Sequence, residues 1–390
     1  MREAPILLDV SRLIWRQWTR RLPTGIDRVC LAYLKYYRSN ARAVVQFRQV
    51  RRILDSKASN RLFNLLLDGS SHFRSDLIWI LATSGWRTEN SRIGQIYLNV
   101  GHTGLNSSHF ERWLADRQLR PVYLIHDLIP ITHPQYCREG EATRHQLRIA
   151  AALRSASGLI TNSAATKHDL ADFARDHGFT MPPHLIAWLG TDRIPLPPAD
   201  PTGRGRPYFV IVGTIEARKN HLTIIRAWRE IVARMGDQAP HLIVIGQRGW
   251  EAAESIAILD DLGPLEGRVT EKAACDDKEM HELLAGAQAI LMPSFVEGFG
   301  LPVVEALQQG VPVIASDLPV FREIVGDIPT YVDPNDRCAW EAAVLGYLGN
   351  GVERKRQLDA ISNFRAPQWA DHFAQVEKFL DGLRPGPIAA

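Results

Sequence analysis

The sequence has little cysteine and no long apolar run, and these two absences exclude several classes of protein. Its four cysteines, Cys30, Cys137, Cys275 and Cys338, lack the close spacing of a metal site, so we expect reduced thiols and no metal. No apolar stretch approaches the ~18 residues of a membrane-spanning helix. The first ten residues do not follow the order of a signal peptide. We therefore expect a cytoplasmic protein.

Acidic residues are scarce near the beginning of the chain. Residues 1–62 contain 14 Lys or Arg and 4 Asp or Glu, although the whole chain has a net charge of only +3. Trp15 and Trp18 lie among arginines in this region. Arginine interleaved with tryptophan is typical of a surface that binds an anionic membrane, which would place the protein peripherally on the inner face of the cell membrane. A solvated basic face explains the pattern equally well, and the lack of a recognised nucleic-acid-binding module argues against nucleic acid as a partner.

Strand and helix patterns alternate along the chain, which predicts an α/β fold with parallel strands. A length of 390 residues favours two domains. Prolines and glycines gather between residues 191 and 207 and predict a linker. We expect one Rossmann-like domain over residues 1–190, a second over residues 208–366, and a C-terminal helix and tail over residues 367–390 that return to the first domain. Two doubly wound domains of this kind hold their ligand in a cleft at the carboxyl ends of their strands.

Apolar runs give the expected strands, and amphipathic segments give the expected helices. In the first domain the strands are residues 6–10, 77–81, 96–100, 122–126 and 158–161, and the helices are residues 27–37, 108–117, 139–155 and 164–176. In the second domain the strands are residues 208–212, 241–245, 289–292, 312–315 and 330–332, and the helices are residues 222–235, 280–287, 302–309 and 339–348. A last amphipathic helix covers residues 370–383.

The segment between residues 293 and 307 says most about chemistry. It joins an expected strand to an expected helix through Gly298 and Gly300, with Pro302 near the first turn of the helix. A helix N-terminus after a glycine loop binds anions, because unpaired backbone N–H groups converge there. Glu297 and Glu305 flank this anion site. Backbone N–H groups that bind anions, together with two carboxylates, suit a ligand with both phosphates and sugar hydroxyls, such as a nucleotide sugar.

A basic turn follows the first strand of the second domain. Gly213 lets the chain turn closely at the end of this strand, and Arg218 and Lys219 stand where the next helix begins. A guanidinium offers a planar pair of donors to phosphate oxygens and an ammonium offers a compact charge, so the two residues suit a diphosphate. The alternative is an exposed basic turn without a ligand. The position at the carboxyl end of a strand favours the ligand site.

Together these segments resemble the retaining glycosyltransferases of family 4, which have the GT-B fold. Residues 297–305 are similar to that family's two glutamates separated by seven residues, and residues 213–220 are similar to its phosphate-binding turn. The resemblance covers the whole second domain and is looser in the first. It implies two Rossmann-like domains that face a central cleft. It also implies a metal-independent hexosyltransferase that needs no cofactor besides its nucleotide-diphosphate sugar donor and is similar to bacterial surface-polysaccharide mannosyltransferases.

The resemblance also implies a role for each residue of the donor site. Arg218 and Lys219 would neutralise the diphosphate as the sugar departs. Glu305 would bind the ribose hydroxyls, and Glu297 would bind a hydroxyl of the sugar. Backbone groups would hold the sugar and phosphates at Gly213, Gly298, Phe299, Gly300 and Leu301.

Segments of the first domain match the family less strictly. Residues 23–28, which include Gly25, resemble a glycine turn that approaches the donor phosphates after the first strand, although Asp27 stands where many relatives have a small residue. His126 ends an expected strand where the family has a histidine that contacts the transferred sugar. Residues 101–104 end another strand and are candidates to line the acceptor pocket. The catalytic residues implied by the resemblance are Glu297, His126, Arg218 and Lys219.

The expected reaction is the transfer of a hexose to a glycan or a lipid-linked acceptor in bacterial polysaccharide biosynthesis. The resemblance favours mannose from GDP-mannose. Two alternatives share the architecture. The first is a nucleotide-sugar epimerase or a synthase that acts on a sugar phosphate. The second is a binding protein without activity, in which Glu297→Ala and Lys219→Ala would leave cellular function intact.

Overall fold

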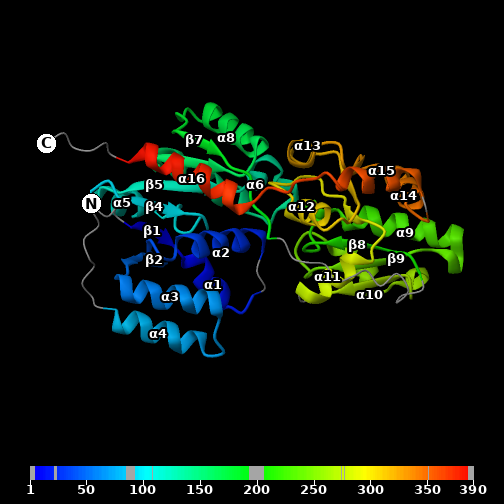
Figure 1. Cartoon of the computed structure of the whole chain (residues 1–390), viewed down its shortest axis with the longest axis horizontal. Helices are drawn as coiled ribbons and strands as arrows, with labels where there is room; N and C mark the ends of the chain where they lie inside the picture. The colour runs from blue at the N-terminus through cyan, green and yellow to red at the C-terminus, as the bar shows by residue number, and fades with distance from the viewer. Residues whose placement is uncertain are drawn as a thin grey trace. The chain divides into compact units, whose positions relative to one another are not determined.

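The computed structural model describes residues 5–21, 24–84, 93–107, 109–192, 206–273, 275, 277–349 and 351–384, and it divides into two compact units (Figure 1). The first unit comprises Met1–Leu128, Thr143–Leu189 and Trp369–Ala390, and the second unit comprises Ile129–Ala142 and Gly190–Gln368. The segment of residues 129–142, which we expected in the first domain, therefore groups with the second unit. Each unit contains its own sheet and core.

In the described part of the first unit, seven strands form one sheet in the order β3-β2-β1-β4-β5-β6-β7. Neighbouring strands are parallel, except that β2 and β3 are antiparallel. The strands are β1 (Ile6–Asp9), β2 (Ala41–Phe47), β3 (Val50–Ile53), β4 (Ile96–Asn99), β5 (Arg120–Ile125), β6 (Gly158–Thr161) and β7 (His184–Ile186). The helices are α1 (Ser11–Trp18), α2 (Gly25–Tyr37), α3 (Ser56–Asp68), α4 (Phe73–Thr83), α5 (Phe110–Asp116), α7 (Glu141–Ser155), α8 (Ala164–Asp176) and α16 (Trp369–Leu383). The strand order reverses between β1 and β4, and such a switch point is where open α/β sheets hold their ligands.

Helix α4 includes residues 77–81, so the strand predicted there was wrong. Leu77 and Ile80 are buried, whereas Ile78 and Trp79 are exposed, which is the pattern of a helix with one apolar face. A run of five apolar residues fits a buried strand and a helix equally well, because it is too short to show a period. Strands β2, β3 and β7 and helices α1 and α3 had no predicted counterpart.

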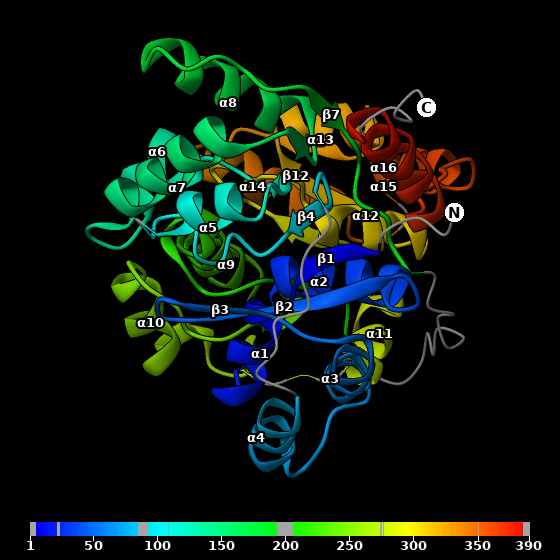
Figure 2. The ribbon, with the colours of Figure 1, turned by 90° about the vertical axis from the view of Figure 1, so that its left-hand side faces the viewer.

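Helices α1, α3 and α4 pack against one another beside the β1–β3 part of the sheet (Figures 1 and 2). Asp55 caps the N-terminus of α3, where its side chain accepts a hydrogen bond from the backbone of Ala58 (2.8 Å). Trp15 and Trp18 of α1 are partly exposed. Within the described ranges, no helix is both long and apolar enough to cross a membrane.

The C-terminal helix α16 packs on the first unit, as predicted. His372 Nδ1 donates to the carbonyl of Trp188 (2.9 Å), so its Nε2 can accept from the Tyr33 hydroxyl (2.8 Å). The ring of Phe373 stacks on that of Tyr36 with centroids 3.9 Å apart. Gly158 lies under the same helix, where a Cβ atom would come within 2.5 Å of a side-chain atom of α16. Because Gly158 has no side chain, α16 can pack closely against the start of β6.

In the described part of the second unit, six parallel strands follow the order β10-β9-β8-β11-β12-β13. The strands are β8 (Tyr208–Val212), β9 (His241–Ile245), β10 (Val269–Lys272), β11 (Ile290–Met292), β12 (Val313–Ser316) and β13 (Thr330–Val332). The helices are α6 (Ile129–Thr132), α9 (His221–Met235), α10 (Ala253–Asp260), α11 (Asp277–Ala285), α12 (Leu301–Gln308), α13 (Pro319–Val325), α14 (Arg337–Gly346) and α15 (Val352–Ile361). The strands are largely buried apolar runs, as parallel sheets covered on both faces require. The order reverses between β8 and β11, so this unit is doubly wound, as predicted.

Candidate active site

The loops that follow β8 and β11 meet at the switch point of the second unit. After β8, Ala217–Lys219 form a 3-10 turn, and Asn220 takes a left-handed conformation with φ of 53° before α9 begins. The amide of Asn220 donates to the carbonyls of Pro293 (3.1 Å) and Pro334 (2.8 Å), which follow β11 and β13. These bonds fix the basic turn against the loop that carries Glu297.

Two cations and two carboxylates alternate at this point. Lys219 Nζ donates to Glu297 Oε1 (2.5 Å), and Arg218 Nη1 donates to Glu297 Oε2 (2.9 Å). Arg218 Nε lies 2.7 Å from Glu216 Oε1. The hydroxyl of Ser294 also donates to Glu297 Oε1 (2.7 Å). The structure therefore brings Glu297 into contact with Arg218 and Lys219, which lie 79 and 78 positions before it in the sequence.

The environment moves the pKa values of these groups in different directions. Burial would raise the pKa of Glu297, but the charges of Lys219 and Arg218 outweigh it and lower that pKa to about 2. Burial lowers the pKa of Lys219, and the charge of Glu297 opposes that change. Burial raises the pKa of Glu216 in spite of the nearby Arg218. Glu297 is therefore a firmly ionised carboxylate, and Glu216 is the carboxylate that accepts a proton more readily.

Two glycines shape the backbone around this cluster. Gly300 precedes α12 with φ of +90°, and a Cβ atom there would lie 2.3 Å from the ring of Phe321. Gly213 directly follows β8 with φ of +144°, and a Cβ atom there would lie 3.4 Å from the side chain of Lys219. Both positions require a conformation that residues with a side chain rarely adopt. The backbone of Leu301 then opens α12 beside the cluster.

The other residues expected to bind the donor lie in the same loop and helix. Phe299 is buried, Gly298 is half-buried, and Glu305 is half-buried in the second turn of α12. The first turn of α12 contains no acidic residue. Pro302 has no N–H, and the N–H groups of Val303 and Val304 donate to the carbonyl of Gly300 (3.0 and 3.4 Å), so Leu301 carries the N–H that this turn can offer to an anion.

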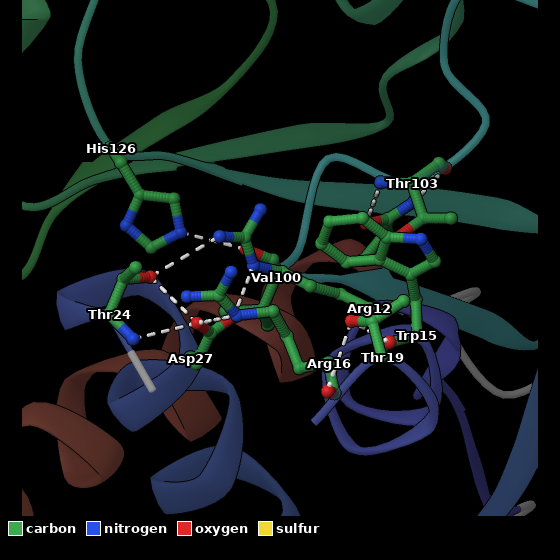
Figure 3. A network of polar contacts seen from close by, with 10 residues as sticks. Arg12, Trp15, Arg16, Thr19, Thr24, Asp27, Val100, Thr103 and His126 are labelled. Carbon is green, nitrogen blue, oxygen red and sulfur yellow. Dashed lines mark hydrogen bonds and ion pairs between the residues drawn. The ribbon is translucent and has the colours of Figure 1, made fainter. Parts of the chain in front are cut away.

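His126 lies in the first unit, at the carboxyl end of β5, and is buried (Figure 3). Its Nε2 donates to the carbonyl of Val100 (2.8 Å), because a carbonyl can only accept. Burial lowers the pKa of His126 to about 4, so the ring is neutral at physiological pH. The ring of His102, in the loop after β4, lies 5.2 Å from it between centroids.

Gly25 also lies in the first unit, as the first residue of α2. The turn comes after the first strand, with helix α1 between β1 and the turn. Asp27 closes a capping box with Thr24, whose backbone N–H and hydroxyl both donate to Asp27 Oδ2 (2.7 Å each). The acidic residue at this position is therefore part of the helix start.

The part of the chain that builds the cluster in the second unit matches a known family. Residues 197–363 match the family described as "Glycosyl transferases group 1". They include the basic turn, the glycine loop and α12.

Curated proteins that resemble this chain include bacterial mannosyltransferases. O-antigen chain mannosyltransferase B of Escherichia coli is 30% identical over 247 residues, which cover 60% of this chain and 63% of the relative. Serotype-specific mannosyltransferase WbdA of Escherichia coli is 27% identical over 224 residues, which cover 54% of this chain and 27% of the relative. O-antigen chain mannosyltransferase RfbU of Salmonella typhimurium is 32% identical over 158 residues, which cover 40% of this chain and 41% of the relative. The chain thus resembles these proteins over less than two thirds of their length.

Solved glycosyltransferase structures share the fold of the whole chain. Alr3699/HepE of Anabaena, solved with UDP and glucose, has a TM-score of 0.68 at 15% identity and aligns over 97% of this chain and 100% of its own. Sucrose-phosphate synthase of Thermosynechococcus elongatus has a TM-score of 0.64 at 16% identity and aligns over 98% of this chain and 99% of its own. The expected GT-B fold is therefore confirmed.

Two residues of the cluster in the second unit had no predicted role. Glu216 stands two positions before Arg218, and Ser294 stands three positions before Glu297. The acidic residue beside the basic turn was a visible signal for a local ion pair. No comparable signal marks Ser294, because serine is common in loops.

Proposed function

We propose that the protein is a glycosyltransferase that moves a hexose from a nucleotide diphosphate to a glycan or lipid-linked acceptor in bacterial polysaccharide biosynthesis. The observation that carries this proposal is the meeting of Arg218 and Lys219 with the glycine loop before α12 at the switch point of the second unit. Cations and a glycine loop before a helix at the carboxyl edge of a parallel sheet suit a diphosphate. The names of the mannosyltransferase relatives support the reaction class.

The donor residues take the following roles in this proposal. Arg218 and Lys219 neutralise the diphosphate, whose charge grows as the bond to the sugar breaks. Gly213, Gly298 and Phe299 and the start of α12 present backbone to the phosphates and sugar. Glu305 binds the ribose, and Glu297, fixed by both cations, accepts a hydrogen bond from a sugar hydroxyl.

The proposed reaction retains the configuration of the sugar. An acceptor hydroxyl attacks the anomeric carbon on the face that the diphosphate leaves, and the departing phosphate oxygen takes the proton of that hydroxyl. This route needs no protein base. The family resemblance assigns a contact with the transferred sugar to His126, whose neutral ring can exchange hydrogen bonds with a hydroxyl. We also propose that Gly25 contacts the donor.

Mannose carried by GDP is the proposed donor, because several relatives are named mannosyltransferases. A thermal-shift panel of nucleotide sugars tests this choice. We expect GDP-mannose to stabilise the protein by ~2.7 kcal/mol at a hundred times its dissociation constant. We expect Lys219→Met to abolish that shift, whereas Lys355→Met, at an exposed position on α15, should keep it. Stabilisation by another nucleotide sugar alone would contradict the choice of donor.

A turnover assay tests the reaction class. GDP-mannose is incubated with and without an oligosaccharide acceptor, and the products are followed by anomeric proton NMR. We expect mannosylated product with a retained α linkage only when acceptor is present. Turnover of the donor without a glycan acceptor would favour an epimerase or a synthase instead, and an inverted linkage would exclude the retaining mechanism.

We also propose that the first unit binds the membrane surface through α1 and α4. Trp15 and Trp18 are exposed by 48% and 37%, with the guanidinium groups of Arg21 and Arg74 lying 5.0 and 5.2 Å from their ring centroids. On α4, Trp79 is exposed by 56%. Indole rings flanked by arginine suit the headgroup region of an anionic bilayer. Flotation with phosphatidylglycerol vesicles at low salt should carry the protein upward. A failure to float would favour a soluble acceptor.

A further inference from the structure

The first unit has its own switch point, between β1 and β4, and Arg12 lies there (Figure 3). Arg12 follows β1 in the first turn of α1, and Gly101 follows β4. A Cβ atom on Gly101 would lie only 2.8 Å from Cβ of Arg12. The loop after β4 therefore leaves room for Arg12, and any larger residue at Gly101 would displace it.

A buried carboxylate fixes the direction of the Arg12 guanidinium. Arg12 Nε donates to Asp27 Oδ1 (2.6 Å), and Arg16 Nε lies 2.7 Å from Asp27 Oδ2. The side chain of Asp27 is 2% exposed and also closes the capping box with Thr24. Burial would raise the pKa of Asp27, but the charge of Arg12 and the bonds from Thr24 lower it. Asp27 is thus an ionised anchor that holds two arginines one helical turn apart (Figure 3).

The guanidinium of Arg12 keeps one side open. Its Nε is held by Asp27, and the neighbouring His126 is neutral and adds no charge. The side chain of Arg12 is 27% exposed. Among the residues that the structure describes, Nη1 of Arg12 has no hydrogen-bond partner. A rigid guanidinium with a free face at the carboxyl edge of a parallel sheet suits a phosphate, which it can bind through two N–H groups.

We propose that Arg12, held in place by Asp27 and assisted by Arg16, binds a phosphate group of the acceptor. This inference rests on the proposed glycosyl transfer. The acceptor supplies the phosphate because the second unit already has Arg218 and Lys219 for the diphosphate of the donor. The same short helix α1 also carries the exposed Trp15, three residues beyond Arg12. A phosphate bound at Arg12 therefore lies beside the surface proposed to meet the membrane, as expected for an acceptor linked to lipid through phosphate.

Binding of geranyl diphosphate, a short soluble isoprenoid diphosphate, tests the proposal without any turnover. The full chain is titrated at low salt, and the Arg12 Nε–Hε resonance is followed by NMR. We expect a saturable shift of that signal with geranyl diphosphate, and none with geraniol, which lacks the phosphates. We expect Arg12→Gln to weaken binding about 10- to 100-fold, the loss typical of a charge-assisted hydrogen bond. Arg38→Gln, at an exposed position after α2, should leave the affinity unchanged.

Two further variants distinguish a loss of the correct position of Arg12 from a loss of folding. Arg12→Lys keeps a positive charge beside Asp27 but loses the planar fork, so it should fold normally and still bind weakly. Asp27→Asn keeps the shape of the side chain but releases both arginines, and it should weaken geranyl diphosphate binding about 10-fold. Equal affinity of Arg12→Gln and the unaltered protein would overturn the proposal, as would an equal loss in Arg38→Gln.

The thermal shift given by GDP-mannose distinguishes the source of the phosphate. We expect Arg12→Gln to keep that shift and Lys219→Met to lose it. Loss of the GDP-mannose shift in Arg12→Gln, with geranyl diphosphate binding intact, would assign the arginine to the donor and overturn the acceptor assignment. If no nucleotide sugar binds while geranyl diphosphate still does, the proposed donor function fails and the phosphate site stands.

Discussion

Loss of Lys219 should destabilise the second unit, and loss of the charge on Glu297 should then restore part of that stability. Lys219 and Arg218 hold Glu297 as an ionised carboxylate whose side chain is only 6% exposed. Lys219→Met removes the closest of these charges and leaves the carboxylate buried with Arg218 and Ser294. Glu297→Gln in the same chain then removes the charge that has lost its partner.

The magnitude follows from the pKa of Glu297. A shift from 4.5 to about 2 corresponds to about 3 kcal/mol of preference for the ionised form in the folded protein. Breaking a buried pair by removing one partner costs ~3–5 kcal/mol, because the other charge stays buried. We therefore expect Lys219→Met to lower the local free energy of unfolding by about 3 kcal/mol. The double variant with Glu297→Gln should recover at least about 1 kcal/mol, as coupled neighbours do.

Native-state hydrogen exchange measured by mass spectrometry reports this effect by segment. Peptides that cover β8 and β11 should exchange faster in Lys219→Met and slow again in the double variant. Peptides from β4 and β5, in the first unit, serve as an internal reference, and Lys355→Met serves as the control for a lost surface lysine. If the effects of Lys219→Met and Glu297→Gln on hydrogen exchange are simply additive, the coupling between the two side chains is refuted.

Three further outcomes follow from other parts of the chain. Gly300→Ala should destabilise α12 and weaken GDP-mannose binding more than Gly310→Ala, because both have positive φ but only Gly300 faces a ring, that of Phe321 at 2.3 Å; thermal shifts compare the two variants. Phe373→Ala should lower the stability of the first unit by ~3–5 kcal/mol, since the side chain is 3% exposed, and urea denaturation measures the loss. Burial lowers the pKa of His221 from 6.5 to about 3, so the unfolded chain binds the extra proton between these values and stability should fall on acidification by about 1.4 kcal/mol per pH unit. In His221→Leu, the slope of the free energy of unfolding against pH, measured by calorimetry at pH 4–7, should be smaller by the contribution of one proton. An unchanged slope would contradict the assignment.

The second unit was predictable from sequence to a large extent. The strands expected at residues 208–212, 241–245 and 330–332 coincide with β8, β9 and β13. Buried parallel strands are short apolar runs bounded by turns, so their pattern is local. The basic turn and the glycine loop were equally visible, because both depend on residues close together in sequence.

The first unit was harder to predict because charged residues lie inside its strands. Arg42 of β2 and Arg51 of β3 are 6% and 8% exposed, and each interrupts an apolar run. The chain compensates Arg42 with the carbonyl of Leu54, which its Nε reaches at 2.9 Å. Such compensation depends on tertiary structure, so local sequence does not reveal it. The role of Asp27 was missed for the same reason, since its partner Arg12 is 15 residues away and in another helix.

In the proposed function, the pairing of Glu297 with both cations limits the positive charge that the site offers to the donor. From the sequence alone, Arg218 and Lys219 are expected to bind a diphosphate with their full positive charge. In the structure they are already shared with Glu297, and Arg218 also contacts Glu216. Glu297 keeps its charge because its pKa is about 2, whereas burial raises the pKa of Glu216. In the proposed function, a diphosphate therefore meets cations whose charge is partly compensated, and the dipole of α12 and the backbone of the glycine loop add to its attraction to the site. In the first unit, by contrast, Nη1 of Arg12 has no partner among the described residues, so this part of the guanidinium is available before any ligand binds.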